Sequence, residues 1–346
     1  MTRPTESRTI GVLTAGGDCP GLNAAIRGVV TRVTAAGGTA IGVQHGWQGL
    51  IEGETRPLRR EDVRGILTRG GTILGTSRMD PYVHGNGLES IRKTITDSGI
   101  ERLIVIGGDG SLRSASRLQT EGLQVIGVPK TIDNDVGGTD LAFGFHTAVQ
   151  IATDAIDRLT TTAESHNRVM VVEVMGRNAG WIAAYAGMAG GAEAILVPEE
   201  EPDLPDLASR LVDRHRSGRD YSIVVVAEGV SMPAGHEKPA AVDAYGFARL
   251  GGVGAAIAQE LERLTGYETR LTTLGYLQRG GTPTAFDRVL ATRFGVTAAA
   301  LALEGVSGVM VALKGDEVVA VDLEAACREP RQLPPSRFLD ASWFFA

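Results

Sequence analysis

Short aliphatic runs that alternate with longer helical patterns are the feature that most restricts how this chain folds. The runs are Ile10–Leu13, Ala40–Val43, Leu103–Ile106, Val125–Val128, Val169–Val174, Ala194–Val197, Ile223–Ala227 and Val309–Leu313. Nearly continuous apolar strands, with helices between them, are typical of parallel sheets covered on both faces. We therefore predict an α/β protein built from doubly wound, mostly parallel sheets.

Length and composition favour two such sheets. The chain has 346 residues, of which 43% are hydrophobic and only 5% aromatic, as in an aliphatic α/β core large enough for two domains. In the stretch 147–163 the aliphatic residues recur at steps of three and four, which predicts a helix. This helix is a candidate bridge between two sheet domains.

The most informative loop follows the run Leu103–Ile106. Three glycines surround one acid in Gly107-Gly108-Asp109-Gly110-Ser111, and a helical pattern begins directly afterwards. Glycines let the backbone approach an anion, and the N-terminus of a helix favours phosphate. An Asp beside such a loop is well placed for Mg²⁺, which bridges phosphate oxygens. A plain strand-to-helix turn has the same composition, so this loop alone leaves both readings open.

A carboxylate cluster follows the next aliphatic run. In Pro129-Lys130-Thr131-Ile132-Asp133-Asn134-Asp135 two carboxylates lie two residues apart, just after a lysine and a threonine. The two carboxylates can take different roles: one acts as a general base that reaches a hydroxyl proton, and the other helps to hold a metal or its water. An Asp-rich surface turn is the alternative for this segment taken alone. Together with the glycine loop, it indicates a phosphoryl-transfer site.

Further polar groups follow other predicted strands. A second glycine loop, Gly16-Gly17-Asp18, precedes a helical pattern, and Arg177 lies in the turn after Val169–Val174. Glu228 follows Ile223–Ala227, either to bond a sugar hydroxyl or to cap a helix. Arginine is the best side chain for gripping phosphate, and ligands bind at the carboxyl ends of parallel strands. The segment 269–283 adds Arg270 and Arg279 on either side of Tyr276.

Charge and cysteine content exclude several other classes. The net charge of -7 argues against nonspecific nucleic-acid binding, which needs a basic stripe. Cys19 and Cys327 lie far apart and outside any metal-ligand spacing, so neither a disulfide framework nor a zinc site is predicted. We expect a soluble, cytoplasmic protein without a membrane span.

These motifs, in their order and spacing, resemble the 6-phosphofructokinases, and more closely the actinobacterial branch. The resemblance rests on Gly-Gly-Asp-Gly-Ser, Pro-Lys-Thr-Ile-Asp-Asn-Asp, Met-Gly-Arg and Leu-Gly-Tyr-Leu-Gln-Arg-Gly-Gly, and runs from about Thr9 to beyond Phe294. It implies a phosphofructokinase fold with the active site in the cleft between two domains. We place the phosphoryl-donor domain at 1–143 plus about 279–330, and the sugar-phosphate domain at about 144–278 plus 331–346.

The resemblance also implies roles for single residues. Asp133 matches the catalytic base that takes the proton of the 1-hydroxyl of fructose 6-phosphate, Thr131 and Arg177 steady the transferring group, and Asp109 holds Mg²⁺. Contacts to the phosphates of ATP fall on Gly17, Arg78, Gly108, Asp109, Gly110 and Ser111. Contacts to the sugar phosphate fall on Thr131, Ile132, Asp133, Met175, Gly176, Arg177, Glu228, Tyr276 and Arg279. Arg168 and Arg270 match arginines that reach the 6-phosphate across a subunit interface, which implies a homotetramer or homodimer.

The donor depends on two positions that point in opposite directions. In this family glycine at position 110 leaves room for the α-phosphate of ATP, whereas enzymes that use pyrophosphate usually carry Asp there. Lys130, however, is the residue that pyrophosphate users carry in this loop. Because steric exclusion is hard to evade, we predict MgATP, with pyrophosphate as the alternative.

The chain departs from the pattern of the 6-phosphofructokinases in two places. Tyr276 stands where the ATP enzymes mostly have His. Thr31 and Thr160 replace two arginines of the effector site of regulated bacterial relatives, while Arg27 and Arg60 match.

Two other classes share part of these motifs. A dinucleotide-dependent dehydrogenase is excluded because the first glycine loop lacks Gly-x-Gly-x-x-Gly. A relative that is non-catalytic, or a small-molecule kinase with another substrate, is the alternative from a different class.

Overall fold

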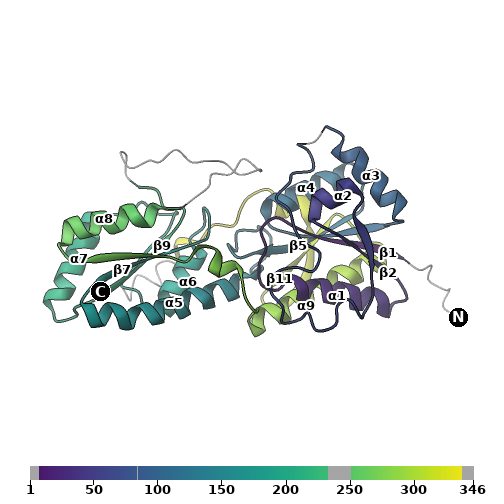
Figure 1. Ribbon diagram of the computed structural model, residues 1–346. Helices are drawn as coiled ribbons and strands as arrows, with labels where there is room; N and C mark the ends of the chain where they lie inside the picture. Colours follow the sequence, from purple (N-terminus) through teal and green to yellow (C-terminus); the bar gives the residue numbers. More distant parts are fainter. Residues whose placement is uncertain (1–7, 84, 233–250, 337–346) are drawn as a thin grey trace.

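The structure is a computed structural model that describes residues 8–83, 85–232 and 251–336. Its strands form two separate sheets, one of eight strands and one of four (Figure 1). Parallel pairing dominates both sheets, and helices cover both faces of each, so the predicted fold class is confirmed. Over the described residues no helix is both long and apolar enough to span a membrane.

The larger sheet has the order β12-β11-β5-β4-β1-β2-β3, with the two-residue β6 paired to β5. Of the strand pairs formed by the described residues in this sheet, β2–β3 and β11–β12 are antiparallel and the others are parallel. Its strands are β1 Thr9–Ala15, β2 Thr39–Val43, β3 Thr55–Leu58, β4 Arg102–Gly107, β5 Val125–Thr131, β6 Phe143–Gly144, β11 Val309–Lys314 and β12 Glu317–Asp322. The chain runs from β1 to β2 on one side and to β4 on the other. Such a reversal of strand order is where open α/β sheets bind ligands.

Helices lie on both faces of the larger sheet (Figure 1). On one face α1 packs against α9, and on the other α2 packs against α3 and α4 against α10. Their bounds are α1 Leu22–Ala35, α2 Gly46–Glu52, α3 Gly87–Asp97, α4 Asp109–Thr120, α9 Ala285–Glu304 and α10 Leu323–Ala326. The helix α4 begins directly after β4, which places the glycine-rich loop at its N-terminus.

The smaller sheet is entirely parallel, with the order β10-β7-β9-β8. α5 and α6 cover one face, and α7 and α8 pack together on the other (Figure 1). The elements are α5 Phe145–His166, β7 Val169–Val174, α6 Trp181–Ala189, β8 Ala194–Leu196, α7 Leu204–Arg216, β9 Ser222–Ala227, α8 Val253–Thr265, β10 Thr269–Thr273 and the 3₁₀ turn η1 Gly275–Arg279. All residues of β7 and β9 are buried, as the continuous Val-rich sequence predicts.

The part of the molecule built on the larger sheet (the larger half) and the part built on the smaller sheet (the smaller half) are joined by α5, by α9 and by the segment after α10. A buried carboxylate links the first two of these connections. α5 leads from β6 of the larger sheet to β7 of the smaller one, and α9 leads back after η1. Asp287, in the first turn of α9, accepts hydrogen bonds from the backbone N–H of Thr147, at 2.7 Å, and from its hydroxyl. The start of each connecting helix is therefore fixed to the other.

Each of the eight aliphatic runs coincides with a strand, and the predicted helix at 147–163 lies within α5. The domain bounds stay a proposal, which rests on the separation of the strands into two sheets. Residues 337–346, which we placed in the sugar-phosphate domain, lie outside the described residues. The edge strands β3 and β10 do not follow from aliphatic runs, because they carry polar residues or proline. The edge strand β12 contains the short aliphatic run Val318–Val321, which was not among the predicted strands.

Candidate active site

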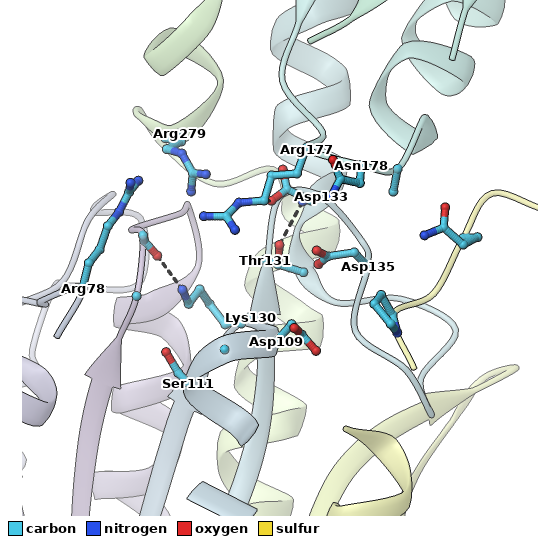
Figure 2. A pocket seen from close by; sticks show the side chains of 17 residues that line it. Arg78, Asp109, Ser111, Lys130, Thr131, Asp133, Asp135, Arg177, Asn178 and Arg279 are labelled. Carbon is cyan, nitrogen blue, oxygen red and sulfur yellow. Dashed lines mark hydrogen bonds and ion pairs between the residues drawn. The ribbon is translucent and has the colours of Figure 1, made fainter. Parts of the chain in front are cut away.

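A pocket lies between the carboxyl ends of β1, β4 and β5 and the turn after β7. Its lining comes from the two glycine loops, the carboxylate loop and the turn that carries Arg177. Further lining comes from residues 327–336, called the C-terminal segment below. Figure 2 shows arginine side chains on one side of this pocket and most of its carboxylates on the other. The lining residues include Gly16, Gly17, Arg78, Gly108, Asp109, Gly110, Ser111, Lys130, Thr131, Asp133, Asp135, Arg177, Asn178 and Arg279.

The two glycine loops lie side by side in this pocket. Gly16 has a φ of +83°, which suits glycine, and a Cβ on Gly17 would lie 2.6 Å from Nη1 of Arg279. The Arg279 guanidinium also donates to the backbone oxygen of Asp18 at 3.2 Å. The sequence assigned Arg279 to the sugar phosphate. In the structure it also contacts the first glycine loop, on the donor side.

Lys130 places a second buried cation, beside Arg279, at these loops. β5 extends to Thr131, so Lys130 is a strand residue, paired with Phe143 of β6. Its ammonium donates to the backbone oxygen of Gly17 (Figure 2). Burial lowers the pKa of Lys130 to about 8, in part offset by Asp133. A cation at this place is suited to compensating the charge of a phosphate held by the loops.

The carboxylates of Asp109, Asp133 and Asp135 form the acidic side of the pocket. Burial, followed by repulsion from Asp133 and Asp109, raises the pKa of Asp135 to about 7. Oδ1 of Asp133 is buried and has no hydrogen-bond partner among the described residues. The backbone N–H of Asp133 donates to the hydroxyl of Thr131 at 3.0 Å, which fixes the start of the loop.

These carboxylates suit Mg²⁺ that arrives with a phosphorylated ligand. Within residues 8–83, 85–232 and 251–336, no group of three or more His, Cys, Asp or Glu side chains is arranged to hold a metal ion. Mg²⁺, however, usually takes one or two carboxylates together with waters and substrate phosphates. Asp109 begins α4 beside the glycine loop, and its carboxylate is 14% exposed and 3.0 Å from Nε of Arg113. The raised pKa of Asp135 is a further sign that the cluster favours an added cation.

The smaller half contributes Arg177 and Glu228. Arg177 has a φ of +53°, and its Nε lies 4.0 Å from Oδ2 of Asp133. Its backbone N–H donates to Oε1 of Glu228 at 3.2 Å. Burial and the nearby Asp133 raise the pKa of Glu228. The turn after β7 and the end of β9 thus present one cation and one carboxyl group to the carboxylate loop.

Seven residues predicted for the sugar site do not line this pocket in the single chain. Met175 and Gly176 adjoin Arg177, Glu228 contacts it, and the Ile132 side chain is buried in the core. The other three are Arg168, Arg270 and Tyr276.

Glu268 contacts the two arginines that we assigned to a subunit interface. It pairs with Arg168 at 2.8 Å and also with Arg270. Tyr276 is 75% exposed.

The pocket also contains residues that the sequence did not single out. Asn178 and Ala179 belong to the same turn as Arg177, so the Met-Gly-Arg motif pointed close to them. Pro330 and Gln332 come from the C-terminal segment, which carries no glycine loop, strand end or charge pattern that indicates a site. Only the path of the chain brings them to the pocket.

Comparison with known proteins gives consistent matches over nearly the whole chain. The family model described as phosphofructokinase matches residues 9–302. The chain is 52% identical to a pyrophosphate–fructose 6-phosphate 1-phosphotransferase of Amycolatopsis mediterranei, over 97% of this chain and 99% of that one. It is 49% identical to an ATP-dependent 6-phosphofructokinase of Corynebacterium efficiens, over 97% and 98%. Among solved structures, Pichia pastoris phosphofructokinase has a TM-score of 0.83 and 33% identity, covering 93% of this chain and 35% of that longer one.

Proposed function

The chain belongs to the phosphofructokinase family, and on this premise we propose that it transfers the γ-phosphoryl group of MgATP to the 1-hydroxyl of D-fructose 6-phosphate. The products are fructose 1,6-bisphosphate and ADP, as in glycolysis. One observation carries this proposal: two glycine loops line the same pocket as the carboxylate of Asp133, which faces Arg177 of the smaller half.

Asp133 is the proposed base. Its carboxylate accepts the proton of the 1-hydroxyl while that oxygen attacks the γ-phosphorus and the bond to the β-phosphate oxygen breaks. The buried Oδ1 without a hydrogen-bond partner among the described residues is available for such a proton. Arg177 and the hydroxyl of Thr131 stabilise the charge on the moving group. Mg²⁺ held at Asp109 would neutralise the phosphate oxygens.

The remaining residues hold the two ligands. We assign the donor phosphates to Gly17, Arg78 and the loop 108–111, and the sugar to Ile132, the turn 175–177, Glu228, Tyr276 and Arg279. Arg168 and Arg270 reach the 6-phosphate from a second copy of the chain, so the active form is a homotetramer or homodimer. We place the enzyme in the cytoplasm, where the free cysteines Cys19 and Cys327 stay reduced.

Pyrophosphate is the second candidate donor, and Lys130 is the observation that favours it. The buried ammonium lies against the first glycine loop, where it can offset the charge of a short donor. Relatives of nearly equal identity are described as using pyrophosphate or ATP. We favour ATP because position 110, in the first turn of α4, is glycine and leaves room for the α-phosphate.

A direct assay separates the donors. Mg²⁺-dependent formation of fructose 1,6-bisphosphate is measured with ATP and pyrophosphate supplied separately at matched concentrations. We expect activity with ATP alone. Activity with pyrophosphate alone would mean that Lys130 outweighs Gly110. Inactivity with both donors would favour the alternative of a non-catalytic relative or a small-molecule kinase for another substrate.

Phosphoenolpyruvate should have little or no effect on the rate. In regulated bacterial relatives a separate interface site uses arginines, of which Arg27 and Arg60 match here. Thr31 and Thr160 replace two of the other arginines. The hydroxyl of Thr160 donates a hydrogen bond to the backbone oxygen of Ile156 at 2.9 Å. A steady-state titration of phosphoenolpyruvate against fructose 6-phosphate tests this expectation. Strong sigmoidal inhibition would contradict it.

A further inference from the structure

The C-terminal segment crosses from one half of the molecule to the other. After α10 in the larger half, the chain shown in yellow in Figure 1 runs to the smaller half near α6. Pro330 and Gln332 line the pocket on the way. Arg331, between them, contacts both halves, as the next two paragraphs describe.

Toward the larger half, Arg331 contacts the carboxylate loop. Its backbone N–H donates to the backbone oxygen of Asp135 at 2.8 Å. Its Nη1 donates to the backbone oxygen of Asn134 at 3.5 Å. Asn134 has a φ of +53° and follows Asp133 directly. Both contacts are therefore made to the backbone on the C-terminal side of the proposed base.

Toward the smaller half, Arg331 contacts the start of α6. Its guanidinium carbon lies 3.9 Å from the ring centroid of Trp181, and the indole N–H donates to the backbone oxygen of Arg331 at 3.3 Å. Trp181 is 2% exposed and begins α6, directly after the turn that carries Arg177. Two residues further, the N–H of Leu333 donates to Glu199 at 3.0 Å, and Glu199 also accepts the N–H of Gly180 at 3.0 Å.

We propose that Arg331 is a positioning residue, which holds the loop of Asp133 at a fixed distance from the turn of Arg177. Asp133 and Arg177 come from different sheets, and their side chains lie 4.0 Å apart. A guanidinium stacked on an indole holds its orientation better than a flexible ammonium does. A misplacement of about 1 Å at reacting groups can lower a rate by about 10²-fold. This inference rests on the proposed roles of Asp133 and Arg177.

Arg331→Ala tests the proposal, with Arg328→Ala as the matched control. Arg328 lies on the same segment and carries the same charge, but its side chain is 72% exposed and its guanidinium lies 3.8 Å from the carboxylate of Glu324. We expect Arg331→Ala to lower kcat by about 10- to 100-fold, with KM for fructose 6-phosphate and for the donor within about threefold of wild type. Arg331→Lys should recover part of kcat, because it restores the cation but not the planar stack. Arg328→Ala should match wild type.

The readouts distinguish positioning from a structural role. A kcat of Arg331→Ala equal to that of Arg328→Ala would overturn the proposal. The proposal would also be overturned if the fall in kcat of Arg331→Ala were matched by a fall in melting temperature and if Arg331→Lys recovered none of the lost kcat. Wild type and Asp133→Ser are assayed alongside. Inactive wild type or an active Asp133→Ser would refute the underlying function or site assignment, whereas an active wild type with unaffected Arg331→Ala refutes only this inference.

Discussion

Replacing Asp133 with serine should lower kcat by about 10²- to 10⁴-fold, the usual contribution of a well-placed general base. Serine cannot accept the proton of the 1-hydroxyl at neutral pH, so the attacking oxygen remains a weak nucleophile. Fructose 6-phosphate should still bind, because Arg279, Glu228 and the turn after β7 are unchanged. The measurement is single-turnover phosphoryl transfer combined with calorimetric binding of the sugar phosphate.

The fold should tolerate this substitution. The backbone N–H of residue 133 would keep its hydrogen bond to Thr131. Burial and then repulsion from Asp133 raise the pKa of Asp135, and removal of the Asp133 carboxylate relieves that repulsion. The melting temperature at pH 7 should therefore be equal to or above that of wild type. Asp140→Ser is the matched control, because Asp140 is 49% exposed and does not line the pocket. Near-normal turnover of Asp133→Ser would remove Asp133 from the role of base.

Gly110→Asp should abolish the use of ATP. Position 110 lines the pocket in the first turn of α4, so a carboxylate there would face the donor phosphates. Juxtaposed like charges cost several kcal/mol, and each 1.36 kcal/mol is tenfold in rate, so kcat/KM for ATP should fall by about 10³-fold or more. The helix should remain folded, because an acidic residue in the first turn is favourable by about 0.3–1 kcal/mol.

Gly110→Asn separates steric exclusion from charge. Asparagine has nearly the size of aspartate without its charge, so a similar loss in both variants would assign the effect to space. Each variant is assayed with ATP and with pyrophosphate, and its folding is checked by circular dichroism. Retention of ATP use by Gly110→Asp would refute the reasoning that assigns the donor to this position.

The central strands could be predicted because their signal is local. Each residue of β7 and β9 is buried in a sheet covered on both faces, so the sequence is nearly all apolar. The charged exception, Glu173, accepts hydrogen bonds from the backbone N–H groups of Gly252 and Gly254. The edge strands β3 and β10 carry polar, partly exposed residues, and β3 contains Pro57. Nothing in such a segment distinguishes a strand from a loop until its neighbour in the sheet is known.

For the candidate site, too, the sequence predicted some features and not others. Gly108–Ser111 follows β4, and Lys130–Asp133 spans the end of β5 and the loop after it. The carboxyl ends of these parallel strands share an edge, so the convergence of the two segments follows from the fold class. The contact of Arg279 with Gly17 could not be predicted, because it joins residues that are far apart in sequence and lie on different elements.

The sequence by itself determined the sheet class, the order of the glycine and carboxylate loops, and the family, because each depends on neighbouring residues within a short segment. Only the tertiary structure decided that Asp133 and Arg177 lie 4.0 Å apart and that Arg331 contacts both of their surroundings. Such contacts depend on how two packed sheets are placed relative to each other. That placement is set by the sum of many weak contacts across the whole chain, and no single motif encodes it.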